Sequence, residues 1–317
     1  MWATFLSFCK LSWAIFVRNR WRTFNLLLKL DARLSLDGYT ISPQNRKRIY
    51  FYTAQSAITT YWFSMLRGYK PTRDETQTAL LLGAFTPIAD DLMDSTGQSF
   101  QALEIDEKLL SAESAMFHFF LNELKAQKKT NKWFATYFDL AHNAQDESLK
   151  QLQNEPLDLN LLETITYNKG GYYTTLYRFA LNHPPVKGEE EAIYTLGAIL
   201  QVLNDLFDMH KDYHNGVQTL VTRTADIHFI AEKLKVLEAR FRQQFMALDY
   251  PSTNKKKAFR AIMAIVTRGH VALAQFQKLQ GDKPTLDIGS YARKPLIVDM
   301  EKPVNIWRNM KATKEVL

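Results

Sequence analysis

Apolar residues recur at three- and four-residue spacings along almost the whole chain, which is the period of an amphipathic helix. Alternating, strand-like runs bounded by tight turns are scarce. Gly (12) and Pro (10) are few for 317 residues, which disfavours turn-rich β-sandwiches and low-complexity chains. The pattern predicts an all-α fold with long helices over residues 44–68, 75–94, 107–127, 132–153, 158–182, 189–213, 227–248 and 254–280.

The ends of several predicted helices coincide with proline or glycine. Four apolar helical runs are followed by such residues: Pro71, Pro184-Pro185, Gly216 and Pro284. No linker rich in Gly, Ser or Pro divides the chain, and we find no internal repeat. We therefore predict an N-terminal amphipathic segment over residues 1–40 that packs on the core of a single helical domain, residues 41–317.

The net charge of +7 would suit acidic partners, but the cations are scattered along the chain. They accompany neither a zinc-finger spacing nor an RNA-binding signature, so we expect solvated helix faces and no nucleic-acid partner. The single cysteine, Cys9, cannot form an internal disulfide, which favours a reducing compartment such as the cytoplasm.

The N-terminus carries an apolar stripe at helical spacing, followed by a basic run: Trp2, Phe5, Leu6, Cys9, Trp13 and Phe16, then Arg18, Arg20 and Arg22. No positive charge precedes the stripe and no small-residue cleavage site follows it, so we expect no signal peptide. No stretch of 18 apolar residues occurs, and we expect no transmembrane helix. We expect a helix docked on the core; the alternative is peripheral membrane contact through residues 1–22.

The first acidic motif, Asp90-Asp-Leu-Met-Asp94, ends a strongly apolar helical run. Asp90 and Asp94 are one helical turn apart, about 40° from each other around the axis. Like charges at this spacing destabilise a helix, and carboxylates at its C-terminal end oppose the helix dipole. A divalent cation between the two carboxylates would remove both penalties.

The second acidic motif lies 114 positions further along the chain. Asn204, Asp208 and Asp212 are spaced four residues apart, so they form a polar stripe within about 80° of arc on one helix. Oxygen ligands without cysteine indicate Mg²⁺, with Mn²⁺ as an alternative, rather than zinc. His210 and His214 lack the partners of a zinc site. We predict that the two stripes face each other and share the metal.

Basic residues upstream of the second motif could bind the phosphate groups that Mg²⁺ favours as ligands. Lys169 and Arg178 are on the preceding predicted helix. Gly170 and Gly171 would break or kink that helix and expose backbone groups to a cavity. We predict Lys169 and Arg178 as diphosphate donors.

Together the two motifs resemble those of the class I isoprenoid synthases, and most closely those of bacterial terpene synthases. Asp90-Asp-Leu-Met-Asp94 matches the aspartate-rich motif, and Asn204-Asp-Leu-Phe-Asp-Met-His-Lys-Asp212 resembles the second metal motif. The resemblance implies a single-domain helical bundle with a central active-site cavity. It also implies metal ligation by Asp90, Asp94, Asn204, Asp208 and Asp212, with Lys211 near the diphosphate.

The motifs also depart from the cyclase pattern. Position 208 is Asp where a cyclase has Ser or Thr. With Gln201 in front of it, the second motif also resembles that of squalene and phytoene synthases. Tyr291 and Arg293 stand where cyclases often carry an Arg-Tyr pair, but in a different order. The Arg-Arg pair and the basic N-terminal segment with which elongating enzymes bind isopentenyl diphosphate are missing. A prenyltransferase and an inactive prenyl-binding homologue remain alternatives.

The resemblance implies that three Mg²⁺ ions bind the diphosphate of a linear C15 or C20 prenyl substrate. Lys169, Arg178, Lys211, Arg293 and Tyr291 would stabilise the leaving diphosphate. The carbocation would cyclise in a dry cavity against aromatic faces. The candidates for these faces are Trp62, Phe63, Phe85, Tyr172, Tyr173 and Phe207. Asp91 and Gln201 would support the ligands, and a homodimer is compatible with this interpretation.

Overall fold

The computed structural model of the chain describes residues 14–106, 108 and 110–317. Every regular element in this part of the chain is helical, and none of its residues forms a strand. The all-α prediction is confirmed. The predicted apolar stripe over residues 2–13 lies outside the described residues.

The chain divides into two compact units. The first comprises Met1–Asp146 and Leu176–Pro184, and the second comprises Glu147–Thr175 and Pro185–Leu317. The division predicted at residue 40 coincides with neither of these boundaries.

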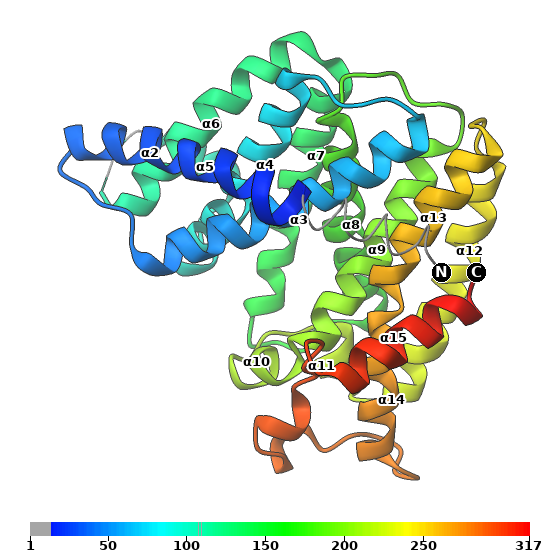
Figure 1. The fold of residues 1–317 in the computed structure, drawn as a ribbon. Helices are drawn as coiled ribbons and strands as arrows, with labels where there is room; N and C mark the ends of the chain where they lie inside the picture. The colour runs from blue at the N-terminus through cyan, green and yellow to red at the C-terminus, as the bar shows by residue number, and fades with distance from the viewer. Residues whose placement is uncertain (1–13, 107, 109) are drawn as a thin grey trace. The chain divides into compact units, whose positions relative to one another are not determined.

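The first unit contains the helices that precede Asp146. After a π-helical segment, Ala14–Asn19, come α2 (Arg20–Leu36), α3 (Pro43–Arg67), α4 (Arg73–Thr96), α5 (Phe100–Ile105), α6 (Ala112–Thr130) and α7 (Lys132–Ser148). The helix α4 packs most extensively against α3 and then against α6 (Figure 1). This packing places the C-terminal end of α4, with the first acidic motif, beside two neighbouring helices.

Local sequence signals define the ends of α3 and α4. Ser42 accepts a hydrogen bond from the Asn45 backbone N–H at the start of α3, and Pro43 occupies the first helical turn. Thr72 and Glu75 form a reciprocal capping box at the start of α4. Gly68 and Gly97 end the two helices with positive φ angles of 82° and 66°, which glycine adopts without strain.

Stacked and edge-to-face rings fill the core of the first unit. Phe85 of α4 contacts Phe100, Phe117, Phe138 and His142, with ring centroids 5.3–6.3 Å apart. Burial lowers the pKa of His142 to about 3, so its imidazole is neutral at physiological pH. The cluster is thus an uncharged core, and it packs against α4, the helix that ends in the first acidic motif.

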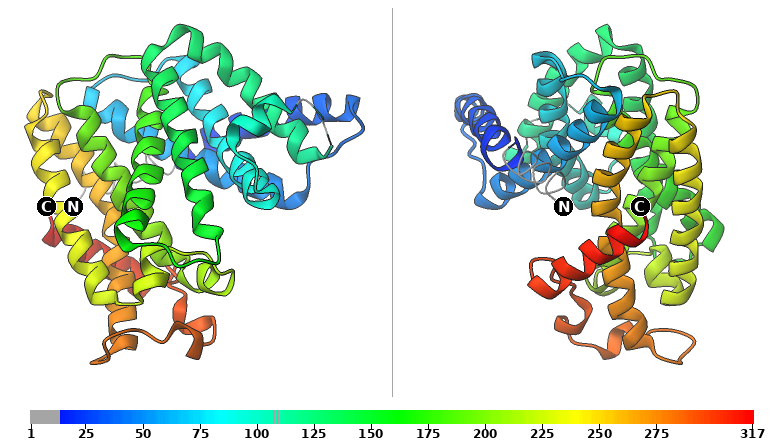
Figure 2. Two further views of the ribbon diagram at one scale, coloured as in Figure 1. Left: turned by 180° about the vertical axis from the view of Figure 1, so that it is seen from behind. Right: turned by 45° about the vertical axis from the view of Figure 1, so that its right-hand side comes forward.

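The second unit contains most of α8 (Leu159–Phe179), then α9 (Glu189–Phe207), α10 (Met209–His214), α11 (Leu220–Thr224), α12 (Ile227–Ala247), α13 (Ser252–Val266), α14 (Arg268–Gln280) and α15 (Pro303–Glu315). Short 3₁₀ turns occupy Leu149–Leu152, Ile288–Ser290 and Lys294–Leu296. The helix α9 packs most extensively against α12 (Figure 2). This pair forms the centre of the unit's apolar core.

Two of the predicted long helices are interrupted without proline or glycine. The helix predicted over residues 189–213 breaks at Asp208, whose ψ of 4° leaves the helical region. The helix predicted over residues 254–280 breaks at Thr267, whose hydroxyl donates to the Met263 carbonyl oxygen one turn earlier at 2.8 Å. None of the described helices is both long and apolar enough to cross a bilayer.

An ion pair links α12 to α14 in the second unit. His270 Nε2 lies 2.8 Å from Glu238 Oε1, and this hydrogen bond raises the pKa of the imidazole. The ion pair therefore contributes its full stabilisation of the folded state below the unfolded-state pKa of His270, about 6.5. This contribution disappears as the pH rises through the folded-state pKa of His270.

We predict that His270→Gln lowers the free energy of unfolding by about 1 kcal/mol more at about pH 5.5 than at about pH 8.5, because glutamine keeps a hydrogen bond but not the charge. Urea denaturation at the two pH values measures the difference. Glu238→Gln should remove the same pH dependence. An equal loss at both pH values would show that the charge of His270 contributes nothing.

Candidate functional site

The three aspartates of the first motif lie on the last turns of α4 and contact different neighbours. Gln145 Nε2 of α7 donates to Asp90 Oδ1 at 2.5 Å. The Asp91 carboxylate forms an ion pair with the Arg48 guanidinium of α3. Asp94 lies further along α4 and is more exposed.

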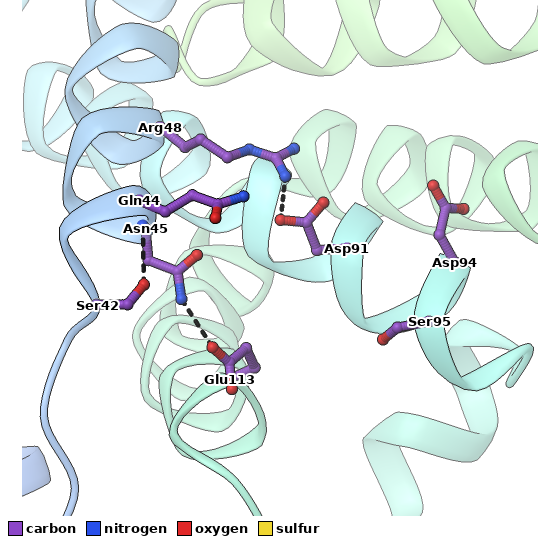
Figure 3. Close-up of a pocket in the computed structure, with 8 residues that line it drawn as sticks. All are labelled: Ser42, Gln44, Asn45, Arg48, Asp91, Asp94, Ser95 and Glu113. Carbon is purple, nitrogen blue, oxygen red and sulfur yellow. Dashed lines mark hydrogen bonds and ion pairs between the residues drawn. The ribbon is translucent and has the colours of Figure 1, made fainter. Parts of the chain in front are cut away.

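Asp91 and Asp94 both line an open pocket of about 460 Å³ in the first unit (Figure 3). The other lining residues are polar: Ser42, Gln44, Asn45, Arg48, Ser95 and Glu113. Asn45 Nδ2 donates to Glu113 Oε1 at 2.8 Å, and Arg48 is directed toward Asp91. The sequence pattern paired Asp90 with Asp94, whereas in the structure it is Asp91 that shares this pocket with Asp94.

The second motif spans the break between α9 and α10. Asn204 is exposed, Asp208 occupies the break, and Asp212 is half-buried on α10. The backbone N–H of Asp208 donates to the Asn204 carbonyl, and that of Asp212 donates to the Asp208 carbonyl, both at 2.9 Å. The four-residue register of the motif therefore survives the break in the helix.

Asp205 lies between the predicted ligands of the second motif and is almost fully buried. Gln201 Nε2 donates to its Oδ1 at 2.8 Å. Gln201 was predicted to support the metal ligands, and Asp205 is not one of the predicted ligands. Burial raises the pKa of Asp205 to about 6. Burial and the charges of Asp205 and Asp208 raise the pKa of Asp212 to about 7. The charged form of this acidic set is therefore destabilised, and a bound cation would stabilise it.

Lys169 is a cation on another helix, α8, and its charge lowers the pKa of both Asp205 and Asp212. A close crossing of α8 and α9 places it there. A Cβ atom built on Gly170 would lie 2.2 Å from the Gly197 carbonyl oxygen, and one built on Gly197 would lie 2.2 Å from that of Gly170. Only glycine at both positions permits this approach.

The predicted kink at Gly170 and Gly171 is wrong. The helix α8 runs without interruption from Leu159 to Phe179. A Cβ atom on Gly171 would lie 2.4 Å from the ring of Tyr194 on α9. Both glycines therefore make room for α9, and they do not open the backbone of α8.

Arg178 does not fit its predicted role as a diphosphate donor. Its side chain is fully buried, at 0% exposure, in the first unit. The guanidinium donates to the carbonyl oxygens of Leu181 and His183, each at 3.3 Å, and of Pro184. The Arg178 guanidinium therefore stabilises the turn that follows α8. The prediction of Arg178 as a diphosphate donor is wrong.

A second open pocket, of about 420 Å³, lies beside the break between α9 and α10. It is lined by Phe207, Asp208, His210, Lys211, His214, Asn215, Arg293, Leu296 and Ile297. The structure thus places Lys211 and Arg293 in one pocket with the motif residue Asp208. Lys211 Nζ lies 4.0 Å from Asp208 Oδ2. Tyr291 is outside this lining, and its hydroxyl donates to the Leu279 carbonyl oxygen at 3.1 Å.

The aromatic residues predicted for a cavity fall into three groups. Trp62, Phe63 and Phe85 are buried in the core of the first unit, with at most 2% of each exposed. Tyr172 and Tyr173 are half-buried in the second unit, and the Tyr172 ring contacts that of Tyr194 edge-on. Phe207 alone among the six lines one of the two pockets described above.

The chemistry of the acidic residues suits Mg²⁺, which takes carboxylate and amide oxygens together with water and phosphate oxygens. Within the part of the chain that the structure describes, no three His, Cys, Asp or Glu side chains converge closely enough to hold an ion. Neither acidic motif is therefore a complete metal site by itself. Ligand oxygens or water would have to supply the remaining coordination positions.

Three residues in or beside the motifs were not singled out from the sequence: Arg48, Gln145 and Asp205. Arg48 belongs to a basic run that was interpreted as a solvated helix face, yet Arg46 pairs with Asp31 at 2.5 Å and Arg48 pairs with Asp91. Asp205 is four residues after Gln201, a spacing that puts the two side chains on one helix face and could have indicated their contact. The partner of Arg48 is distant in sequence and leaves no local signal.

Comparison with known proteins adds no assignment. The chain matches no family model, and no curated protein matches its sequence. Its function must therefore be inferred from the motifs and the geometry described above.

The close crossing of α8 and α9 yields a stability prediction. We expect Gly197→Ala to lower the free energy of unfolding by at least about 2 kcal/mol, because the new methyl group overlaps the backbone of α8. Gly216→Ala is the comparison: Gly216 has a φ of 69° but open space around it. That variant should lose only about 1 kcal/mol through backbone strain. Equal losses in chemical denaturation would refute a steric role for Gly197.

Proposed function

We propose that the protein is a Mg²⁺-dependent class I terpene synthase with an isoprenoid-synthase-type helical fold. Its substrate would be a linear prenyl diphosphate, most consistent with C15 or C20, which ionises to a carbocation that cyclises as diphosphate is released. The observation that carries the proposal is the pocket of the second unit, where Asp208 of the acidic motif meets Lys211 and Arg293. A pocket that combines an acidic metal ligand with cations suits a metal-bound diphosphate.

The predicted ligands are Asp90 and Asp94 on α4 and Asn204, Asp208 and Asp212 around the α9–α10 break. Bound Mg²⁺ would supply the positive charge that makes diphosphate a good leaving group. Lys211 and Arg293 would donate charge-assisted hydrogen bonds to the diphosphate oxygens. Lys169 would reduce the repulsion between Asp205 and Asp212 while the site is empty.

The apolar residues of the same pocket support an amphiphilic substrate. Phe207, Leu296 and Ile297 line it together with the charged residues. A prenyl diphosphate has one strongly anionic end and a hydrocarbon chain, and it would contact both kinds of surface. The face of the Phe207 ring could stabilise positive charge on the reacting carbon atoms.

Incubation with Mg²⁺ and, separately, geranyl, farnesyl or geranylgeranyl diphosphate tests the reaction class. Without isopentenyl diphosphate, the proposal predicts release of inorganic diphosphate and formation of hydrocarbon or alcohol products, detected by gas chromatography and mass spectrometry. Longer diphosphates formed only with isopentenyl diphosphate would indicate an elongating prenyltransferase. C30 or C40 hydrocarbons would indicate head-to-head coupling, and unchanged bound substrate an inactive homologue.

Substitution of one ligand in each motif tests the site itself. Asp90→Ala and Asp208→Ala should each lower the turnover at least about a hundredfold, because each removes a carboxylate that binds the metal. Asp249→Ala removes an exposed carboxylate outside both motifs and should leave turnover unchanged. Retention of activity in both motif variants would remove the metal-site assignment.

A further inference from the structure

The helix α2 has two apolar faces, and only one of them packs on the part of the chain that the structure describes. Its buried residues are Thr23, Leu26, Leu27, Leu30 and Leu34. Trp21, Phe24 and Leu28 belong to the other face and are 65%, 43% and 51% exposed. Large apolar side chains exposed at this density need an explanation beyond the folding of α2.

The exposed residues form a continuous ridge. At 100° per residue, Trp21, Phe24 and Leu28 fall within about 60° of one another around the helix axis, opposite the centre of the buried face. Val17, one turn earlier, has 45% of its surface exposed and extends the ridge. The Trp21 and Phe24 rings contact each other, with centroids 5.9 Å apart. The ridge therefore points away from the core along its whole length.

Positive charge lies along one side of the ridge. Arg22 and Lys29 fall within about 20° of each other around α2, and Arg18, in the π-helical segment before α2, lies close enough to Arg22 for its charge to act on it. Arg18 and Lys29 are exposed, and burial together with the charge of Arg18 lowers the pKa of Arg22. The nearby acids are each engaged by an arginine: Asp37 by Arg33 at 2.7 Å and Asp31 by Arg46 at 2.5 Å. The charge beside the ridge is thus clearly positive.

We propose that α2 is a membrane-surface helix that lies in the interface of a lipid bilayer containing anionic lipids. Trp21, Phe24 and Leu28 enter the boundary between headgroups and acyl chains, where an aromatic side chain is favoured. Arg18, Arg22 and Lys29 contact the lipid phosphates. Charge complementarity selects this partner, since an apolar ridge bordered by cations matches an apolar layer bordered by anions. This contact is independent of the proposed catalytic function, and it extends the membrane contact that the sequence left open for residues 1–22 to the exposed face of α2.

Sedimentation of the full chain with lipid vesicles tests the proposal. Vesicles of equal amounts of phosphatidylcholine and phosphatidylglycerol should bind the protein at least about tenfold more tightly than vesicles of phosphatidylcholine alone, because each cation near the surface adds to the attraction. Raising the salt concentration should weaken binding to the anionic vesicles. Failure to bind anionic vesicles at physiological salt would overturn the proposal.

Paired variants separate the two parts of the surface. The double variant Trp21→Ser and Leu28→Ser should reduce vesicle binding at least about tenfold by removing apolar contact. The double variant Arg18→Glu and Lys29→Glu should abolish the preference for anionic vesicles. All four side chains are exposed, so thermal unfolding should be nearly unchanged and will show that the variants fold.

Two control variants match these changes elsewhere on the surface. Val236→Ser removes an apolar side chain with 64% exposure from α12. Lys256→Glu with Lys257→Glu makes the same change in net charge on exposed positions of α13. Both controls should retain binding. If the controls lose as much binding as the α2 variants, the attraction is unspecific and the proposal fails.

A second copy of this chain is the competing occupant of the ridge. Sedimentation equilibrium without lipid distinguishes it: the proposal predicts the same oligomeric state for the native chain and for the Trp21→Ser, Leu28→Ser variant. Conversion of a dimer into monomers by this variant would show that the ridge is a subunit interface, and would overturn the membrane assignment.

Discussion

The helices α8 and α9 of the second unit cross closely, and Gly170 and Gly197 meet there backbone to backbone. Nothing larger than a hydrogen atom fits at either position, so the spacing of the two helices is set by the sequence. This spacing brings Lys169 next to Asp205 and Asp212. The charges around the second acidic motif thus depend on the steric constraint at Gly170, the residue next to Lys169.

The same electrostatic arrangement occurs in both units. In each, an acidic motif at the C-terminal end of an apolar helix is met by a cation from another helix: Arg48 beside Asp91, and Lys169 beside Asp205. Helix ends of this kind repel carboxylates through the helix dipole, so the cations offset a cost that the motifs carry. Burial and the charges of Asp205 and Asp208 raise the pKa of Asp212 to about 7, so its charged form stays destabilised. A divalent cation that binds carboxylates destabilised in this way would stabilise their charged form.

Most of the helices could be predicted from the sequence, because apolar period and capping residues are local. The start of α3 at Pro43 and its end before Gly68 follow directly from such signals. A helix was predicted over residues 158–182, but its passing Gly170 and Gly171 without a break could not be predicted, since the cost of glycine in a helix, about 1 kcal/mol each, is offset by packing against α9 that only the fold reveals. The partner of Arg48 lies on another helix and could not be predicted either. Arg178 donates to carbonyl groups three to six residues further along the chain, in the turn after α8. For the site, sequence identified Asp208, Lys211 and Arg293, which the structure brings together, whereas the metal coordination of these motifs stays a prediction.

The central claim is that the acidic motifs bind diphosphate through Mg²⁺, and calorimetric titration with inorganic diphosphate tests it most directly. The account predicts binding that requires Mg²⁺, and an affinity at least about tenfold lower in Asp208→Asn, which keeps the shape of the side chain but removes its charge. Binding of equal strength with and without Mg²⁺, or unchanged in Asp208→Asn, would contradict it.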